Sequence, residues 1–101
     1  MIVRVFRAVI KPGRQADFEK FVREVAAPEV WRQKGVVAQY SGKPFGSNSN
    51  EFVFVSLWDD LGHLKAYAGE NWEKPVTEPG EEELLQETFV YNYEVFDSHT
   101  R

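Results

Sequence analysis

The sequence predicts an α+β domain with the ferredoxin-like element order β-α-β-β-α-β. Segments rich in β-branched and aromatic residues alternate with two segments of helical periodicity, and turn residues separate them. A length of 101 residues fits one domain, residues 1–101. Because crossover connections are right-handed, both helices should cover one face of a four-stranded antiparallel sheet of strand order 4-1-3-2.

A change of hydrophobic period separates the first strand from the first helix. Residues 2–10 (IVRVFRAVI) predict a strand that stops at a Lys-Pro-Gly turn. From residue 14 to at least residue 27, apolar side chains recur at helical spacing between charged ones. Pro28 should kink or end this helix, and a further segment over 28–33 could begin afresh before Gly35 closes the region.

The middle of the chain contains the clearest strand. Residues 36–41 predict the second strand, and a polar loop over 45–50 (FGSNSN) leads to the third strand, 51–58 (EFVFVSLW). Asp59 or Asp60 then suits the N-cap of a helix. Apolar residues at helical spacing follow and predict a short second helix.

The last third of the chain returns to a strand after an irregular segment. Gly69 should end the second helix, and residues 71–80 (NWEKPVTEPG) hold two prolines and predict no regular element. Residues 81–86 predict one helical turn, whose three glutamates we expect to be solvated and favoured by the helix dipole. Residues 87–97 (ETFVYNYEVFD) predict the fourth strand, before a polar tail.

The predicted strands are apolar on both faces. In strands 2–10 and 51–58, residues of either parity are mostly apolar, and strand 87–97 has Phe89, Tyr91, Tyr93 and Val95 on one face and Val90 and Phe96 on the other. Two helices cover only one face of a sheet, and a second apolar face of four strands exceeds the few hundred Å² that monomers usually expose. The sequence therefore predicts a homodimer in which two sheets pack face to face about a two-fold axis. It leaves open which face does so.

Composition and charge exclude several classes of function. The net charge is −4 and the basic residues are scattered, so we expect neither nucleic acid nor a membrane as a partner. The absence of cysteine removes disulfides, thiolate metal sites and thiol catalysis. Asp59, Asp60 and Glu70 form too thin a cluster to predict a metal site, and no phosphate-binding or flavin motif is present. Without a signal-peptide pattern or an apolar span, we expect a cytoplasmic protein.

The run from 52 to 76 (FVFVSLWDDLGHLKAYAGENWEKPV), with the Lys-Pro-Gly turn after the first strand, resembles the antibiotic biosynthesis monooxygenase (ABM) domain family. The resemblance covers nearly the whole chain, including the final aromatic strand. It implies a dimeric α+β barrel with a pocket between the sheet and its covering helices. Members of this superfamily include cofactor-independent monooxygenases that oxidise polycyclic aromatic phenols to quinones, and others that degrade haem.

The resemblance also provides a test for haem degradation. The haem-degrading relatives have a typical pattern: an asparagine on the first strand, a tryptophan on the second helix and a histidine soon after it. Phe6, Tyr67 and Val76 occupy these positions here. His63 comes too early to replace the histidine, and His99 lies in the tail. Because iron chemistry depends on its axial ligand, haem degradation is not expected.

The cofactor-free reaction needs only an aromatic pocket, a group that deprotonates the phenol and exclusion of water. His63 is the candidate general base, because an imidazole titrates near neutral pH. Arg4 or Arg7 could hold a phenolate, but they lie on opposite faces of the first strand, so at most one can face the pocket. The full set of candidates is catalytic His63, Tyr67, Asn71 and Trp72, and substrate-binding Arg4, Phe6, Arg7 and Trp58.

Each candidate also has a purely structural interpretation. His63 could be a solvated surface residue, and Trp58 could simply pack under the second helix. Tyr67 and Trp72 could seal the irregular segment over the core. The arginine that faces away from the pocket could enter the dimer interface and pair with Glu94 on the neighbouring fourth strand.

Two functions remain in view from the sequence. The first is a cofactor-independent monooxygenase that acts on a small aromatic, phenolic substrate. The alternative is a non-catalytic dimer that binds a small molecule or serves a stress response, because the sequence shows no compelling acid–base pair.

Overall fold

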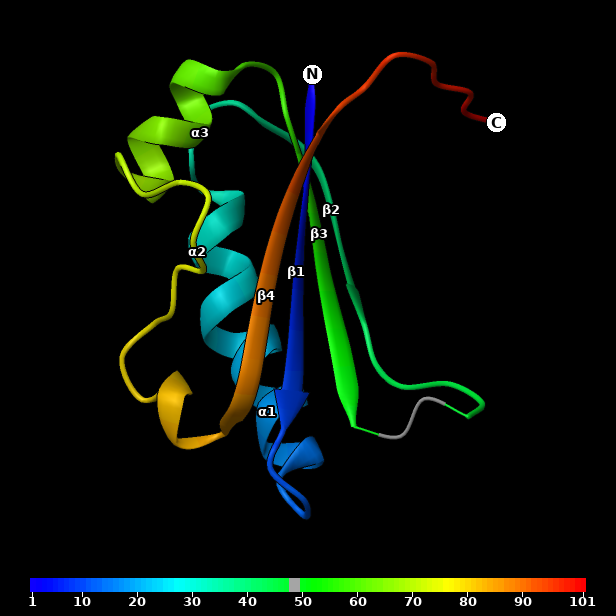
Figure 1. The fold of residues 1–101 in the computed structure, drawn as a ribbon, viewed down its shortest axis with the longest axis vertical. Coiled ribbons are helices and arrows are strands. Elements are labelled where there is room, and N and C mark those ends of the chain that lie inside the picture. Colours follow the sequence, from blue (N-terminus) through cyan, green and yellow to red (C-terminus); the bar gives the residue numbers. More distant parts are fainter. Residues whose placement is uncertain (48–49) are drawn as a thin grey trace.

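A computed structural model describes residues 1–47 and 50–101 and confirms the predicted α+β fold. The four strands are β1 (Ile2–Ile10), β2 (Val36–Gly42), β3 (Glu51–Trp58) and β4 (Leu85–Glu94). They form one sheet of order β2-β3-β1-β4, and every neighbouring pair is antiparallel. This is the predicted strand order, and all helices lie on the same side of the sheet (Figure 1).

The register of the central strand β1 decides which residues share a face. Arg4 is paired with Ser56 of β3 and with Asn92 of β4, whereas Val5 is paired with Val55 and Tyr91. Side chains of paired residues point to the same face, and successive residues alternate. Even-numbered residues of these three strands therefore face the helices and odd-numbered residues form the opposite, open face, except that a register shift after Val9 places Leu85 opposite Ile10 and against the core.

The first helix continues through Pro28, so of the two predicted outcomes, a kink or an end, the end does not occur. It comprises α1 (Gln15–Phe21), a π-helical turn (Val22–Ala26) and α2 (Ala27–Trp31) without interruption. A proline ring in a regular α-helix collides with the carbonyl four residues earlier. Here the Ala27 N–H bonds to the Val22 carbonyl five residues back, so the helix widens directly before the ring and then continues.

The short helix α3 (Leu61–Ala68) has the predicted caps. The Asp60 carboxylate accepts a hydrogen bond of 2.8 Å from the backbone N–H of His63. Gly69 ends the helix with φ of +81°, a conformation that favours glycine. Leu64 is fully buried and anchors α3 on the sheet.

The C-terminal third departs from the prediction at its boundaries. Residues Glu81–Glu83 form a 3₁₀ turn, and β4 begins two residues earlier and ends three residues earlier than predicted. It lies at the edge of the sheet beside β1, and its ladder runs from the Ile10 pair at Leu85 to the Ile2 pair at Glu94. In the predicted polar loop 45–50, residues 48–49 lie outside the described part.

The core under the helices consists of two clusters. One packs α1 and the π turn on the lower sheet, and the other packs α2 and α3 on the upper sheet (Figure 1). Phe6 borders the first cluster and Phe54 borders the second. Phe6 on β1 and Phe54 on β3 are cross-strand partners, and the space beside them, between the two clusters, is not filled by side chains.

The open face of the sheet carries large exposed side chains. Tyr40, Tyr93 and Tyr91 are 71%, 55% and 46% exposed, and the valines between them are partly exposed. No helix in the described ranges covers this face (Figure 1). In the same ranges, no helix has the length and apolar character needed to cross a membrane.

Candidate functional site

A cavity of about 270 Å³ lies between the first helix and the sheet. Its wall is mainly aromatic and aliphatic: Phe6, Ala8, Phe18, Val22, Ala26, Ala27, Phe52 and Phe54. The Phe18 and Phe52 rings meet edge to face, with centroids 5.1 Å apart. The polar wall comprises Ser41, Lys43, Glu19, Arg23 and Glu81. The volume lies just below the roughly 300–1,000 Å³ typical of small-molecule sites, which indicates a small ligand.

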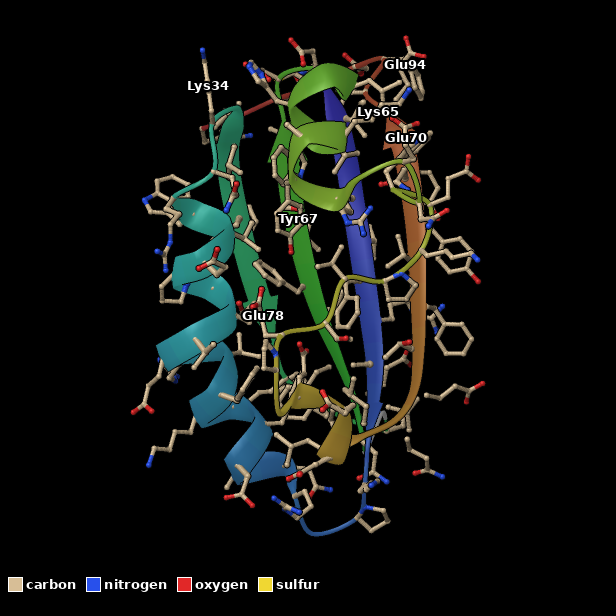
Figure 2. All side chains as sticks on the ribbon, turned by 90° about the vertical axis from the view of Figure 1, so that its left-hand side faces the viewer. Lys34, Lys65, Tyr67, Glu70, Glu78 and Glu94 are labelled. Atoms are coloured by element: carbon tan, nitrogen blue, oxygen red, sulfur yellow. The ribbon has the colours of Figure 1, made fainter. Side chains whose placement is uncertain are left out.

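A second, smaller hollow of about 40 Å³ adjoins this cavity, and half of the residues in its wall have polar side chains. The two share Phe6, Ala26, Phe54 and Glu81 as walls. The additional walls of the small hollow are Arg4, Val30, Ser56, Tyr67, Val76 and Glu78. Figure 2 shows Tyr67 reaching from α3 toward the segment that carries Glu78. The site is therefore a ring-lined chamber with a polar inner end.

Arg4 is buried and fastens the irregular segment 71–80 to the sheet. One guanidinium nitrogen donates to the Lys74 carbonyl at 2.9 Å, and the other donates to the Trp72 carbonyl. A third, longer bond of 3.4 Å reaches the Asn92 side chain. Burial lowers the pKa of the Arg4 guanidinium, and the nearby Tyr67 opposes this shift. Arg4 thus borders the hollow, but its donors already hold the segment that closes it.

Tyr67 is the partly buried phenol of the hollow. Its ring stacks on Trp58 at a centroid distance of 5.4 Å. Burial, helped by the charge of Glu78 and opposed by that of Arg4, raises the pKa of Tyr67 to about 12. The phenol therefore stays protonated at neutral pH and remains available as a hydrogen-bond donor.

Glu81 is the site residue that the sequence interpretation missed. We expected the three glutamates at 81–83 to be solvated, but Glu81 is only 4% exposed and lines both hollows. Its Oε1 accepts a 2.9 Å hydrogen bond from the Glu78 N–H. Burial raises the pKa of this carboxyl, and the Glu78 N–H works against the shift. One sequence signal was present: Glu81 precedes the buried Leu84 by three residues, which places both on one side of a 3₁₀ turn.

Trp58, Trp72 and Asn71 serve the packing around the site. Trp58 is fully buried, and its Nε1 donates to the Ser56 hydroxyl at 2.9 Å. Trp72 packs against the cluster that contains Trp58. Asn71 is exposed, and its carbonyl accepts from the Lys74 N–H. Within the described residues, none of the three side chains lines either hollow, although the Trp58 ring stacks on the Tyr67 ring.

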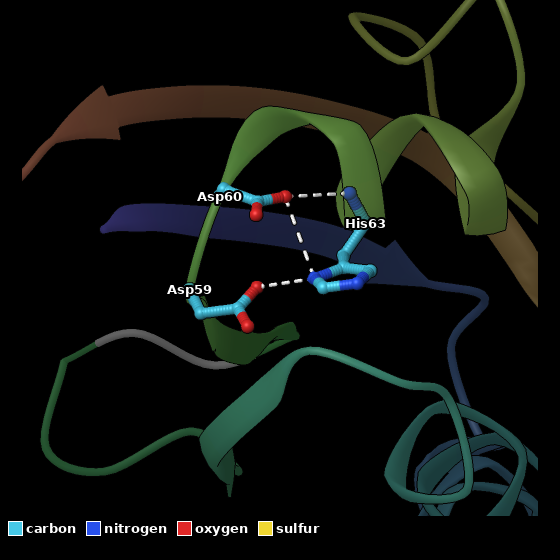
Figure 3. Close-up of side chains that lie close together, drawn as sticks. All are labelled: Asp59, Asp60 and His63. Atoms are coloured by element: carbon cyan, nitrogen blue, oxygen red, sulfur yellow. Dashed lines mark hydrogen bonds and ion pairs between the residues drawn. The ribbon is translucent and has the colours of Figure 1, made fainter.

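His63 lies at the start of α3 beside Asp59 and Asp60 (Figure 3), and it lines neither hollow. Its Nδ1 is 2.6 Å from Asp59 Oδ1 and 3.4 Å from Asp60 Oδ1, and the bond to His63 lowers the pKa of Asp59. Gly35 makes this pair possible, because a Cβ there would fall 2.4 Å from the His63 Cβ. The three potential ligand atoms lie within 4.8 Å of one another. Asp60 already caps α3, and we assign no cation to this exposed group.

Arg7 faces the open side of the sheet, so only Arg4 of the two arginines borders the site. Arg7 Nε is 2.5 Å from Glu51 Oε1, and its guanidinium lies 5.3 Å from the centre of the Phe89 ring. The predicted pairing with Glu94 is wrong. Glu94 is paired with Ile2 at the far end of β4 (Figure 2), because the strand register places Phe89 opposite Arg7.

The three positions that the haem-degrading pattern occupies come together in the structure. Phe6, Tyr67 and Val76 all line the small hollow, although they come from β1, α3 and the irregular segment. The resemblance therefore pointed to three positions that share one hollow in the fold. A phenylalanine, a tyrosine and a valine supply no imidazole ligand for iron there.

Comparison with known proteins places this geometry in a wider context. The family model of the antibiotic biosynthesis monooxygenases (ABM) matches residues 1–71. A proposed antibiotic biosynthesis monooxygenase from Deinococcus radiodurans has a similar structure, with a TM-score of 0.77, 14% identity and coverage of 100% of this chain and 98% of that chain. SnoaB, a cofactor-independent oxygenase from Streptomyces nogalater, has a TM-score of 0.71 and 18% identity over 96% of this chain and 94% of its own.

A third similar structure is a variant of MhuD with two manganese protoporphyrin IX molecules bound per active site. Its TM-score is 0.75, with 16% identity over the full length of both chains. At such identities the three structures show only that this chain has the same fold. Their activities are not thereby assigned to it. No curated protein matches the sequence significantly.

Proposed function

Because the chain belongs to the antibiotic biosynthesis monooxygenase family, we propose that it is a cofactor-independent monooxygenase for a small phenolic substrate. The observation that carries the proposal is the 270 Å³ chamber whose wall includes four phenylalanine rings and one buried carboxyl group. Aromatic walls suit a flat apolar ring, and the few polar groups orient it.

The proposed reaction asks little of the protein beyond binding, deprotonation and exclusion of water. The bound phenol loses its O–H proton, and the phenolate passes an electron to O₂. One oxygen atom of O₂ becomes bonded to a ring carbon, and the other leaves as water with the O–H and ring C–H hydrogens. One phenol and one O₂ thus give one quinone and one water. The ring transfers the electrons, so the proposal requires no cofactor.

The residues proposed for this site are those that border the hollows. Phe6 contributes a ring to both hollows, and Tyr67 offers a protonated hydroxyl at the polar end. Arg4 keeps the segment 71–80 in place over that end. The geometry provides no contact between the chamber and His63, Asn71, Trp72 or Arg7, so we do not assign them a role in the reaction.

The second part of the proposal is a homodimer formed through the open face of the sheet. The exposed tyrosines on this face, Tyr40, Tyr91 and Tyr93, surround half-buried valines. This apolar face has no cover within the described chain, and a second copy would cover it symmetrically. Sedimentation at micromolar concentration should give twice the 11.7 kDa of the chain. A mass of one chain would contradict the dimer.

Turnover tests the enzymatic proposal. Dihydroxynaphthalenes incubated with the protein in air should give quinone absorbance and consume one O₂ per quinone, whereas anaerobic samples should not change. Ala26 borders both hollows, so Ala26→Met should narrow them and lower turnover, while Ala16→Met on the exposed side of the helix should leave turnover unchanged. Equal rates with and without protein would refute the monooxygenase. Binding without turnover would favour the alternative, a non-catalytic binding dimer.

A further inference from the structure

Glu81 occupies the junction between the ring-lined chamber and the polar hollow. It lines both, together with Phe6 and Phe54, and is 4% exposed. Carboxylates are rarely buried to this degree, because the charge loses its hydration. A buried carboxyl that faces a cavity therefore needs an explanation.

The contacts of Glu81 leave part of its hydrogen-bonding capacity unused. A carboxylate offers about four acceptor positions. In the described part of the chain, its one hydrogen bond comes from the Glu78 N–H, and no cationic side chain forms an ion pair with it. The turn explains only this one bond, and a glutamine could accept it equally well. Glu81 lines the aromatic chamber as well as the small hollow, so a ligand in either can use the remaining acceptor capacity.

The neighbours of Glu81 define what could meet this oxygen. Phe6 and Phe54 provide apolar surface on the chamber side, so a ring fits there. Of the cationic side chains that line the two hollows, Arg23 and Lys43 pair with Glu19, and Arg4 donates to two carbonyls of segment 71–80. A ligand hydroxyl would supply the missing donor, whereas a ligand carboxylate would place a like charge against a buried one.

We infer that Glu81 is the specificity-determining residue of the chamber: it accepts a hydrogen bond from the hydroxyl of a neutral aromatic ligand and excludes aromatic carboxylates. This inference deepens the proposed function and rests on it for the location of the ligand. The same contact directs the phenolic O–H at the Glu81 carboxylate, which receives the proton when the phenolate forms.

Binding without oxygen tests the inference separately from turnover. The protein would be titrated anaerobically with 2-naphthol, its methyl ether 2-methoxynaphthalene, and 2-naphthoate. Isothermal titration calorimetry would measure the affinity for each ligand. The unmodified protein should bind 2-naphthol about tenfold or more tightly than the ether, because a hydrogen bond to a charged group is lost. It should bind 2-naphthoate most weakly. Equal affinity for 2-naphthol and the ether, or no binding of any of the three, would overturn the inference.

Variants assign the effect to one carboxyl group. Glu81→Gln keeps the acceptor for the Glu78 N–H and should lose the preference for 2-naphthol, while Glu83→Gln, an exposed neighbour in the same turn, should retain it. An unchanged preference in Glu81→Gln would also overturn the inference. The comparison of naphthol and ether needs no variant, so it holds even if Glu81→Gln folds poorly. A Glu81-dependent preference without quinone formation would refute only the monooxygenase, and quinone formation with no such preference would refute only this inference.

Discussion

Replacing Arg4 should loosen the segment that closes the polar end of the site. Arg4→Met keeps an unbranched stem of similar length and removes the donors to the Trp72 and Lys74 carbonyls. Hydrogen bonds to charged groups contribute about 1.5–3 kcal/mol each. The variant no longer buries a charge, which offsets part of the loss. We therefore expect the free energy of unfolding to fall by about 2–4 kcal/mol, and Tm by roughly 10–25 °C for a domain of this size.

Two measurements check this expectation. Urea denaturation gives the change in stability, and hydrogen exchange should show faster exchange at the amides of Lys74, Glu81 and Leu84, which hydrogen-bond within or beside the segment. Arg32→Met is the control, because Arg32 is 67% exposed and its ion pair with Glu29 should contribute less than about 1 kcal/mol. A loss below about 1 kcal/mol in Arg4→Met, or exchange that accelerates equally throughout the chain, would refute the anchoring role.

Three further substitutions test other parts of the structure. Gly35→Ala places a Cβ 2.4 Å from that of His63 at φ of +98°, so thermal unfolding should show a loss of at least about 1–2 kcal/mol; an unchanged Tm would contradict the close contact. The raised pKa of Glu81 means that the folded protein binds this proton more tightly than the unfolded chain, so stability is lost as pH rises from about 4.3 through the raised pKa. The stability of Glu81→Gln relative to the unmodified protein should therefore be higher at pH 8 than at pH 4 in urea titrations, and equal differences at both pH values would argue against a raised pKa. Val55→Asp on the open face should dissociate the proposed dimer in sedimentation, whereas Val25→Asp on the exposed side of the first helix should not.

The sequence predicted the elements whose signals are local. The bounds of β1 and β3 match because their β-branched and aromatic runs end at clear turn and cap residues. The helix α3 also matches, because Asp60 and Gly69 determine its two ends. Local signals were insufficient for β4. Its aromatic alternation continues to Phe96, but the regular ladder stops at Glu94, and the next contact with the first strand is a single hydrogen bond from the Val95 N–H to the Met1 carbonyl.

Pro28 shows how a local rule can be overridden. The sequence correctly identified the residue that disturbs the helix, but the outcome depended on packing. Val22, Ala26 and Val30 are all buried against the sheet, so continuing the helix keeps them in the core. A single π-helical turn accommodates the ring at the cost of one irregular hydrogen bond.

The sequence by itself determined that the sheet has two apolar faces and that one arginine of β1 at most could face the helices, because side chains alternate along a strand. Only the tertiary structure decided that Arg4 is this arginine and that its donors are occupied by segment 71–80. It also decided which glutamate of the run 81–83 is buried. The three residues are chemically identical, and the path of the chain after Gly80 turns Glu81 alone of these three inward, beside Leu84. Burial of a charged side chain is a property of what surrounds it, and those surroundings come from β1, β3 and the first helix, far away in sequence.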